Sequence, residues 1–187
     1  PKGVAVTHSH WMSGLWLLAF VYARHIFDDV ALLGLPWYAP AGQIQLLAAC
    51  LAGTTVVLHT FSAKSFAELI EREKVTVTYL GGTQYRMVRD YLDTCGRTYD
   101  FSSLRSIRVG ARPMPSDQVK DMLDFFKIPY HHTHRVLSMT EVLPYGAAIL
   151  SGEDIARGLQ PDATEKEKRR VDSVGRPYLT MIKIVDD

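Results

Sequence analysis

Hydrophobic and polar residues alternate along the chain in blocks whose periods predict helices and strands in turn. Residues 9–26 are apolar on nearly every helical face and contain no proline, which predicts a largely buried helix. A short continuous apolar run over 30–35, ended by Pro36, is typical of a strand that is buried on both faces. The remaining predicted elements are helices over 43–51, 66–73, 84–95 and 116–126 and strands over 54–59, 75–80, 104–109 and 130–136.

Turn and capping residues mark where these elements begin and end. Gly53 and Gly96 stand where two of the helices would stop, as glycine often does just after the last helical turn. Ser65 is predicted to cap the helix over 66–73, because Glu68 three residues later would complete a capping box. Strands that alternate with helices indicate βαβ units. The chain is therefore predicted to be an α/β fold with a mainly parallel sheet and helices on both faces.

The pattern changes after residue 150 and divides the chain into three expected parts. Residues 1–150 form the alternating strand and helix core. Residues 151–172 include Gly, Pro and an unbroken charged run over 165–170, so we expect an exposed connection with a solvated surface. Residues 173–187 end in a segment, 179–185, that predicts a last strand. Because the chain opens at Pro1 and closes within this strand, we expect an internal piece of a longer protein.

Composition excludes several classes of protein. The 187 residues are 47% hydrophobic and 22% charged, which is ordinary for a globular chain and excludes a disordered or collagen-like one. A formal net charge of +1 does not indicate a nucleic-acid binder. The longest apolar stretch, 11–23, is shorter than the ~20 residues that cross a bilayer, so no transmembrane segment is expected. The two cysteines, Cys50 and Cys95, exclude a disulfide framework and favour a cytoplasmic location.

Unusual residues follow three of the predicted strands. In parallel sheets, ligands bind at the carboxyl ends of the strands. An aromatic and proline loop occupies 36–42, a segment with Gly110 and Ala111 occupies 110–115, and a hydroxyl stands beside a carboxylate in Thr140–Glu141. A hydroxyl can donate to a phosphate oxygen, and a carboxylate can hold a magnesium ion that bridges phosphates. Each signal is weak alone, but their joint order is less easily dismissed.

Three histidines, His131, His132 and His134, lie close together in the sequence. On the strand predicted there, His132 and His134 would share one face and His131 would point away. No cysteine lies near enough in sequence to complete a zinc site. Packing and polar partners are therefore favoured over a metal role.

Six motifs occur in the order and spacing of one enzyme family. The chain resembles the adenylate-forming, AMP-binding superfamily, which includes acyl-CoA synthetases, luciferase and the adenylation domains of peptide synthetases. The resemblance covers essentially all 187 residues. The segments that carry it are PKGVAVTH (1–8), DDVALLGLPWYAPAG (28–42), GTTVVLHTFSAKSFAELIEREKVTVTYLGGT (53–83), FSSLRSIRVGARPMP (101–115), SMTE (138–141) and DSVGRP (172–177).

The resemblance implies that the chain is the central part of the large N-terminal domain of an acyl-CoA synthetase-like enzyme, and that the complete enzyme performs a two-step reaction. A carboxylic acid attacks ATP to give an acyl-adenylate and pyrophosphate, and a thiol such as coenzyme A then takes the acyl group. Mg²⁺ is the implied metal. The family's phosphate loop and its lysine-bearing C-terminal domain would lie outside this chain, so the chain alone is expected to be inactive.

The resemblance also assigns roles to residues of this chain. Thr140 and Glu141 would be the catalytic pair, with Glu141 as the magnesium ligand. The implied nucleotide-binding residues are Lys2, Gly3, Gly110, Ala111, Arg112, Pro113, Leu137, Ser138 and Met139. The implied acid pocket and thiol tunnel contain Trp37, Tyr38, Ala39, Gly42, Gly81 and Gly82. For the aromatic pair and for the two glycines, simple core packing and a simple turn remain the alternatives.

Several positions depart from the family pattern. Ser138 stands where the family has a glycine, Arg112 where a small residue is common and Gly82 where proline is common. Leu137 stands in place of the aromatic residue that packs on adenine, and Ala39 stands in place of the usual histidine. These departures leave open a non-catalytic module that binds a nucleotide or a partner. Peptide-synthetase adenylation is disfavoured, because the aromatic loop has no aspartate for a substrate amine and Asp28 and Asp29 precede the strand, at its amino end.

Overall fold

The computed structural model describes residues 3–22, 26–36, 38–110, 114–142, 148–177 and 181–183. Its helices are α1 (His8–Trp16), the π-helix η1 (Leu17–Tyr22), α2 (Pro40–Leu51), α3 (Ala63–Glu73), α4 (Gly82–Thr94), α5 (Ser116–Phe125), the 3₁₀ turns η2 (Tyr130–His132) and η3 (Thr140–Val142), α6 (Gly152–Gly158) and α7 (Glu165–Val171). Its strands are β1 (Val30–Leu33), β2 (Thr55–Leu58), β3 (Val77–Tyr79), β4 (Ser106–Arg108), β5 (Arg135–Leu137), β6 (Ala148–Leu150) and β7 (Arg176–Pro177). No helix in the described part of the chain is both long and apolar enough to span a bilayer.

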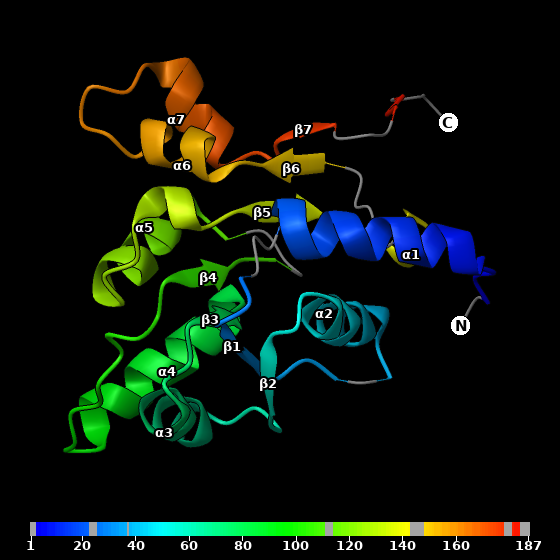
Figure 1. The fold of residues 1–187 in the computed structure, drawn as a ribbon. Coiled ribbons are helices and arrows are strands. Elements are labelled where there is room, and N and C mark those ends of the chain that lie inside the picture. Colours follow the sequence, from blue (N-terminus) through cyan, green and yellow to red (C-terminus); the bar gives the residue numbers. More distant parts are fainter. Residues whose placement is uncertain are drawn as a thin grey trace.

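A four-stranded parallel sheet organises the first two thirds of the chain (Figure 1). Its order is β2-β1-β3-β4, so the chain first moves to one side of β1 and then returns to the other. Ala31 pairs with both Val56 and Val77, which places β1 in the middle of the sheet. The predicted α/β fold is confirmed, because all four strands were expected and run parallel.

Helices cover both faces of this sheet. Ala31 and Leu33 point to the face on which α2 packs through Leu46 and Ala49. Leu32, between them in sequence, points to the other face because side chains alternate along a strand. There it joins the main core, whose other fully buried members include Phe66, Ile70, Tyr85, Val88, Ile107, Met122 and Leu123 from β4, α3, α4 and α5. The continuous apolar run of β1 thus reflects burial on both faces, whereas the edge strand β2 is partly exposed.

A buried carboxylate joins the amino ends of three neighbouring strands. Asp29, which is 1% exposed, directly precedes β1 and accepts hydrogen bonds from both Nε and Nη2 of Arg105, just before β4. The hydroxyl of Thr76, just before β3, donates to Asp29 Oδ1 at 2.7 Å. The expected position of Asp29 at the amino end is confirmed, and the residue holds the sheet together there.

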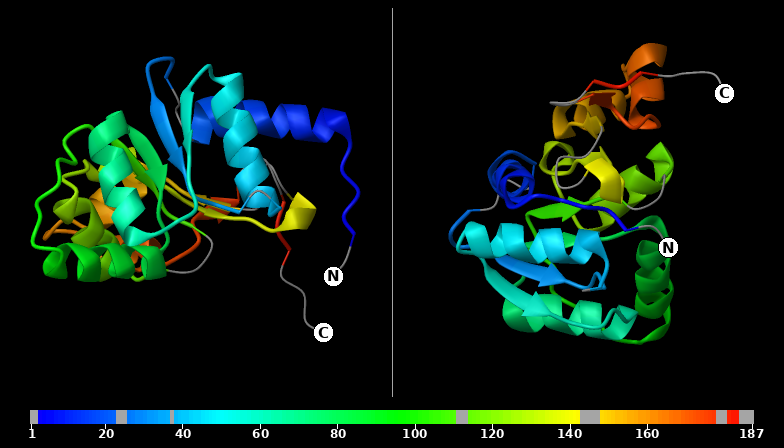
Figure 2. Two further views of the ribbon diagram at one scale, coloured as in Figure 1. Left: turned by 90° about the horizontal axis from the view of Figure 1, so that it is seen from below. Right: turned by 90° about the vertical axis from the view of Figure 1, so that its right-hand side faces the viewer.

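A second, antiparallel sheet of order β5-β6-β7 extends beside the first (Figure 2). A parallel bridge between Val109 and Arg135 connects the two sheets. The guanidinium of Arg135 is buried and donates to the carbonyl oxygens of Val171 at 3.0 Å and of Met114. Burial lowers the pKa of Arg135. This sheet was not predicted, because β6 is only three residues long and gave no alternation to detect.

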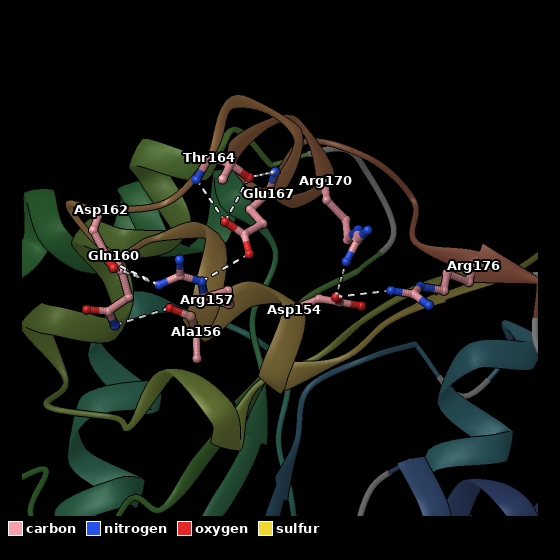
Figure 3. A network of polar contacts seen from close by, with 9 residues as sticks. All are labelled: Asp154, Ala156, Arg157, Gln160, Asp162, Thr164, Glu167, Arg170 and Arg176. Carbon is pink, nitrogen blue, oxygen red and sulfur yellow. Dashed lines mark hydrogen bonds and ion pairs between the residues drawn. The ribbon is translucent and has the colours of Figure 1, made fainter.

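The segment 151–172, which we expected to be an exposed connection, contains two capped helices that were not predicted (Figure 3). Thr164 caps α7, and Glu167 completes a capping box with it. Hydrogen bonds from Thr164 and Arg157 lower the pKa of Glu167 to about 2. Asp154 of α6 then pairs with Arg170 at 2.7 Å and with Arg176 at 3.6 Å, which attaches α7 and β7 to α6. The charged run is thus a polar network as well as a solvated surface.

Two local predictions were wrong in detail, and a third falls mostly outside the described residues. Helix α3 begins at Ala63, because the hydroxyl of Ser62 accepts from the backbone N–H of Ser65, so Ser62 is the cap and Ser65 replaces Glu68 in the box. The expected strand over 130–136 starts as a 3₁₀ turn after Pro129 and becomes extended only at Arg135. Of the expected strand over 179–185, only residues 181–183 are described, and they are not in a strand.

The buried Asp29 network gives a prediction for stability. Asp29→Asn should lower the free energy of unfolding by about 3 kcal/mol, because Arg105 loses its counter-charge in a buried setting. Asp28→Asn is the matched control, since Asp28 is exposed, and should stay within about 0.5 kcal/mol of the parent. Urea denaturation followed by circular dichroism measures both. Equal losses for the two variants would show that the network is not what holds the strands.

Candidate functional site

The described candidate residues, apart from Gly3, lie directly after the carboxyl ends of β1, β3, β4 and β5. The chain reverses its direction of travel across the sheet between β1 and β3. In open α/β sheets this reversal leaves a crevice at the carboxyl ends, because the following segments diverge to opposite faces. The residues after the four strands are therefore placed around the position where a ligand is expected.

Two of the candidate glycines are close neighbours. The N–H of Leu80 donates to the carbonyl oxygen of Arg108 at 3.0 Å, which aligns the ends of β3 and β4. As a result, a Cβ added at Gly81 would lie 3.7 Å from the carbonyl oxygen of Gly110. Gly81 is also the amino cap of α4, and its N–H donates to Oε1 of Gln84 at 3.0 Å. Small residues on both strand ends keep this part of the edge open to a close approach.

The hydroxyl of Tyr79 leaves no room for a side chain at position 110, which is a glycine. Tyr79 pairs with Arg108 across β3 and β4, and a Cβ added at Gly110 would overlap the Tyr79 hydroxyl. Burial raises the pKa of Tyr79 to about 12, so the phenol remains neutral at physiological pH. A neutral hydroxyl thus lies against the backbone of the predicted nucleotide-binding turn.

The aromatic loop after β1 leads directly into α2. Ala39 is the amino cap of this helix, and Tyr38 is 88% exposed, so Tyr38 does not pack in the core of the described chain. Gly42 is buried, and a Cβ there would collide with the carbonyl oxygen of Pro36. The loop therefore folds tightly back on the first turn of α2. Trp37, the other predicted pocket aromatic, lies outside the described residues.

A buried arginine connects this helix to the neighbouring strand end. Nη1 of Arg108, the last residue of β4, donates to Oε1 of Gln45 in α2 at 2.8 Å. Arg108 is only 3% exposed, and its burial lowers its pKa to about 10, so it stays cationic at neutral pH. This contact holds the first half of α2, and with it the aromatic loop, near the end of β4.

The residues after β5 form an exposed polar segment. Leu137, Ser138, Met139, Thr140 and Glu141 are all exposed, and the last two lie in the 3₁₀ turn η3. Within the described residues, no hydrogen bond or ion pair engages the side chains of Thr140 and Glu141. The Glu141 carboxylate is thus open to a cation, and the Thr140 hydroxyl is open to an acceptor.

Some predicted residues are not brought together by the described contacts. Gly3 is exposed and has nothing within 4 Å of an added Cβ, although the N-terminal segment lies on the side of the molecule toward which β5 runs (Figure 1). Lys2, Ala111, Arg112 and Pro113 lie outside the described residues. No group of three or more metal-binding side chains occurs in the part of the chain that is described. His132 instead has Nδ1 3.1 Å from the carbonyl oxygen of Arg105.

Sequence reasoning missed several residues at this edge. His59 follows β2 and lies against Gly34, where an added Cβ would be 2.6 Å from Nε2 of the imidazole. Burial lowers the pKa of this imidazole. Gln118 of α5 donates from Nε2 to the carbonyl oxygen of Gly82 at 3.1 Å. His59 and Tyr79 lie at the carboxyl ends of two predicted strands. The rule that ligands bind at the carboxyl ends of parallel strands could therefore have identified both. Gln118 gave no sequence signal, because it lies on a helix far along the chain.

A parallel α/β sheet with glycines at its carboxyl edge, and with an exposed Thr-Glu pair after the adjoining strand β5, is typical of a ligand-binding domain of the open α/β class. The family comparison agrees with this geometry. The model of the family described as AMP-binding enzyme matches residues 1–187, and the chain belongs to that family.

Several relatives have known names or structures. A feruloyl-CoA synthase of Amycolatopsis sp is 30% identical over 126 residues, which is 66% of this chain and 25% of the relative. The long-chain-fatty-acid-CoA ligase of Archaeoglobus fulgidus is 21% identical and has a TM-score of 0.74 over 95% of this chain and 34% of its own. The O-succinylbenzoate coenzyme A synthetase of Bacillus subtilis, solved with ATP and a magnesium ion, is 26% identical, with a TM-score of 0.69 over 100% of this chain and 35% of its own. The chain thus spans about a third or less of these relatives.

The contact between Tyr79 and Gly110 gives a second prediction. Gly110→Ala should destabilise the protein by about 2 kcal/mol, because the added methyl overlaps the Tyr79 hydroxyl. The double variant Tyr79→Phe/Gly110→Ala should recover about 1 kcal/mol of that loss, since the hydroxyl is gone. Urea midpoints of both single variants, the double variant and the parent measure the coupling. Strictly additive losses would mean that something other than the hydroxyl excludes a side chain at position 110.

Proposed function

We propose that this chain forms the nucleotide- and acid-binding part of an enzyme that activates a carboxylic acid with ATP. The intact parent protein would join the acid to AMP with release of pyrophosphate. It would then transfer the acyl group to coenzyme A as a thioester. Membership of the AMP-binding enzyme family and relatives named as CoA synthases and CoA ligases support this proposal.

One observation carries most of the proposal. Thr140 and Glu141 are exposed and without a partner among the described residues, at the end of the strand that is bridged to β4. The neighbouring end of β4 carries Gly110, which lies against Gly81. An acidic side chain beside a hydroxyl and a glycine-lined edge suits a phosphate chain that arrives with a cation.

The donor set at this edge fits magnesium, which prefers oxygen ligands and keeps several waters of its own. We assign Glu141 as the residue that would hold Mg²⁺ and Thr140 as the donor to a phosphate oxygen. Bound Mg²⁺ would offset the repulsion between the carboxylate substrate and ATP. Leu137, Ser138 and Met139 would line the nucleotide together with residues 110–113. Lys2 and Gly3 would close the phosphate side.

The aromatic loop and α4 are assigned to the acid and the thiol. Tyr38, Ala39 and Gly42 would line the acid pocket with Trp37, and Gly81 and Gly82 would border the path of the thiol. The small side chain of Ala39 leaves room for a bulky acid. The contact of Arg108 with Gln45 would keep this pocket next to the nucleotide.

The chain spans about a third or less of its relatives, so we assign the complete activity to the intact parent protein only. We expect the 187-residue chain to show no acid-dependent turnover by itself. The identity of the acid is left to experiment. A cytoplasmic location remains a prediction from the cysteine content.

The assignment of Glu141 can be tested directly. Glu141→Gln in the intact protein should reduce acid-dependent ATP–pyrophosphate exchange by about 10²-fold, the scale of losing one electrostatic group in a transition state. The measurement is incorporation of labelled pyrophosphate into ATP with a panel of carboxylic acids.

A matched control is available on α7. Glu165 is also exposed, with its side chain 80% accessible, and Glu165→Gln should leave exchange unchanged. If Glu141→Gln exchanges at the parental rate, Glu141 is not in the active site. If the parent itself binds ATP but exchanges with no acid, the chain is a nucleotide-binding module and not part of a ligase.

The acid pocket can be tested at Ala39. Ala39→Phe should shift the preference of the intact enzyme toward shorter or slimmer acids, because the ring would fill the pocket space next to the loop. The neighbouring Ala41 is exposed on α2, so Ala41→Phe should leave the rank order of acids unchanged. The ratio of kcat/KM across the panel measures the shift. An identical rank order for both variants and the parent would make this loop purely structural.

A further inference from the structure

A groove of about 400 Å³ opens at the end of the molecule opposite to the candidate site. One wall is the segment that precedes β4 and includes Tyr99, Phe101 and Leu104. The other wall is the carboxyl end of α5, with Phe125, Phe126 and Lys127. Because β4 starts at Ser106, this groove lies at the amino ends of the strands and is separate from the nucleotide edge.

The floor of the groove is aromatic. Tyr99 and Phe126 are buried, while Phe101 and Phe125 are partly exposed. The rings of Phe101 and Phe126 meet edge to face with centroids 5.2 Å apart, and those of Tyr99 and Phe101 are stacked at 6.3 Å. The guanidinium of Arg89 lies over the Phe125 ring, 4.4 Å from its centroid, and that of Arg97 lies over the Tyr99 ring at 4.5 Å. A flat apolar group would pack on the ring surfaces that remain open to the groove.

Most charges around the groove cancel in pairs. Asp100 lines the groove, but one carboxylate oxygen accepts from the Lys74 ammonium at 3.1 Å and the other from the Ser102 N–H at 2.9 Å. The guanidinium of Arg97 pairs with Glu71, and that of Arg89 lies 3.5 Å from the Asp121 carboxylate. Each of these pairs is neutral as a unit, so none gives the groove a net charge.

Lys127 is the exception. It is exposed at the rim, and among the described residues no carboxylate pairs with its ammonium group. Its backbone is left-handed, with φ of 56°, a conformation that favours glycine and is strained for lysine. Lys74 adopts the same conformation at the end of α3, yet its ammonium is engaged by Asp100. The groove therefore carries one uncompensated positive charge beside an aromatic floor.

We propose that this groove binds a small aromatic carboxylate, with the ring against Phe101 and Phe125 and the carboxylate at the Lys127 ammonium. The volume falls in the range of small-molecule sites. The net positive charge selects an anion over a neutral or cationic analogue of the same shape. This inference does not depend on the proposed function, because the groove lies away from the nucleotide edge.

Calorimetric titration of the full-length protein with 2-naphthoate tests the proposal. The neutral analogue 2-naphthylmethanol should bind more weakly, and Lys127→Gln should weaken naphthoate binding about fivefold, the scale of one hydrogen-bonded charge in a partly exposed setting. Lys64→Gln removes an exposed lysine on α3 and should leave binding unchanged. Lys127→Gly should show the same loss with an equal or higher melting temperature, because glycine suits the left-handed backbone.

The outcomes separate this groove from the proposed acid pocket. Loss of naphthoate binding in the Lys127 variants, with binding retained in Ala39→Phe, supports the groove. Loss in Ala39→Phe alone places the ligand in the acid pocket and overturns the proposal. Absence of binding to the parent protein, or equal affinity for the neutral analogue, also overturns it. None of these outcomes alters the result expected for Glu141→Gln in the ATP–pyrophosphate exchange assay, so either proposal can fail without the other.

Discussion

The parallel sheet depends on the hydrogen bonds that the buried carboxylate of Asp29 accepts from Thr76 and Arg105. This carboxylate lies in front of β1 and receives hydrogen bonds from the segments that lead into β3 and β4. These contacts set the relative starting points of three strands that are far apart in sequence. Because parallel strands of similar length that start together also end together, the same interaction aligns the carboxyl ends where Gly81 and Gly110 meet.

The amino and carboxyl ends of the parallel sheet differ in the charged and polar groups that they carry. At the amino end, charge is concentrated and compensated, as in the contacts of Asp29 with Arg105 and of Lys74 with Asp100. At the carboxyl end, small residues and the open side chains of Thr140 and Glu141 leave polar groups available. Under the proposed function, a phosphate chain that arrives with its cation would be accommodated at the carboxyl end. At the amino end, Lys127 carries a charge that no carboxylate of the described residues pairs with.

The sequence predicted the parts of the fold that rest on long periodic patterns. The four parallel strands and helices α2 to α5 were anticipated, because each combines an apolar run with a clear start or stop residue. Helices α6 and α7 were missed although Thr164 and Glu167 form a capping box, since their charged surfaces show no apolar period. The carboxyl-end rule predicted the loops over 36–42 and 110–115 and the Thr140–Glu141 pair, whereas Gly81 and Gly82 came only from the family resemblance. Contacts between distant elements, such as Arg108 with Gln45, needed the structure, because no local pattern encodes them.

The junction between the two sheets decides whether the candidate groups can act on one ligand. Thr140 and Glu141 follow a strand of the antiparallel sheet, whereas Gly81 and Gly110 follow strands of the parallel one. One side-chain and one backbone hydrogen bond close this junction: the hydroxyl of Thr133 donates to the carbonyl oxygen of Ile107 at 2.6 Å, and the backbone N–H of Val109 donates to the carbonyl oxygen of His134 at 3.3 Å. Strand β5 therefore continues the parallel sheet at its start while it pairs with β6 on its other side. Its carboxyl end consequently points the same way as that of β4, which brings the Thr-Glu pair to the same edge as the glycines.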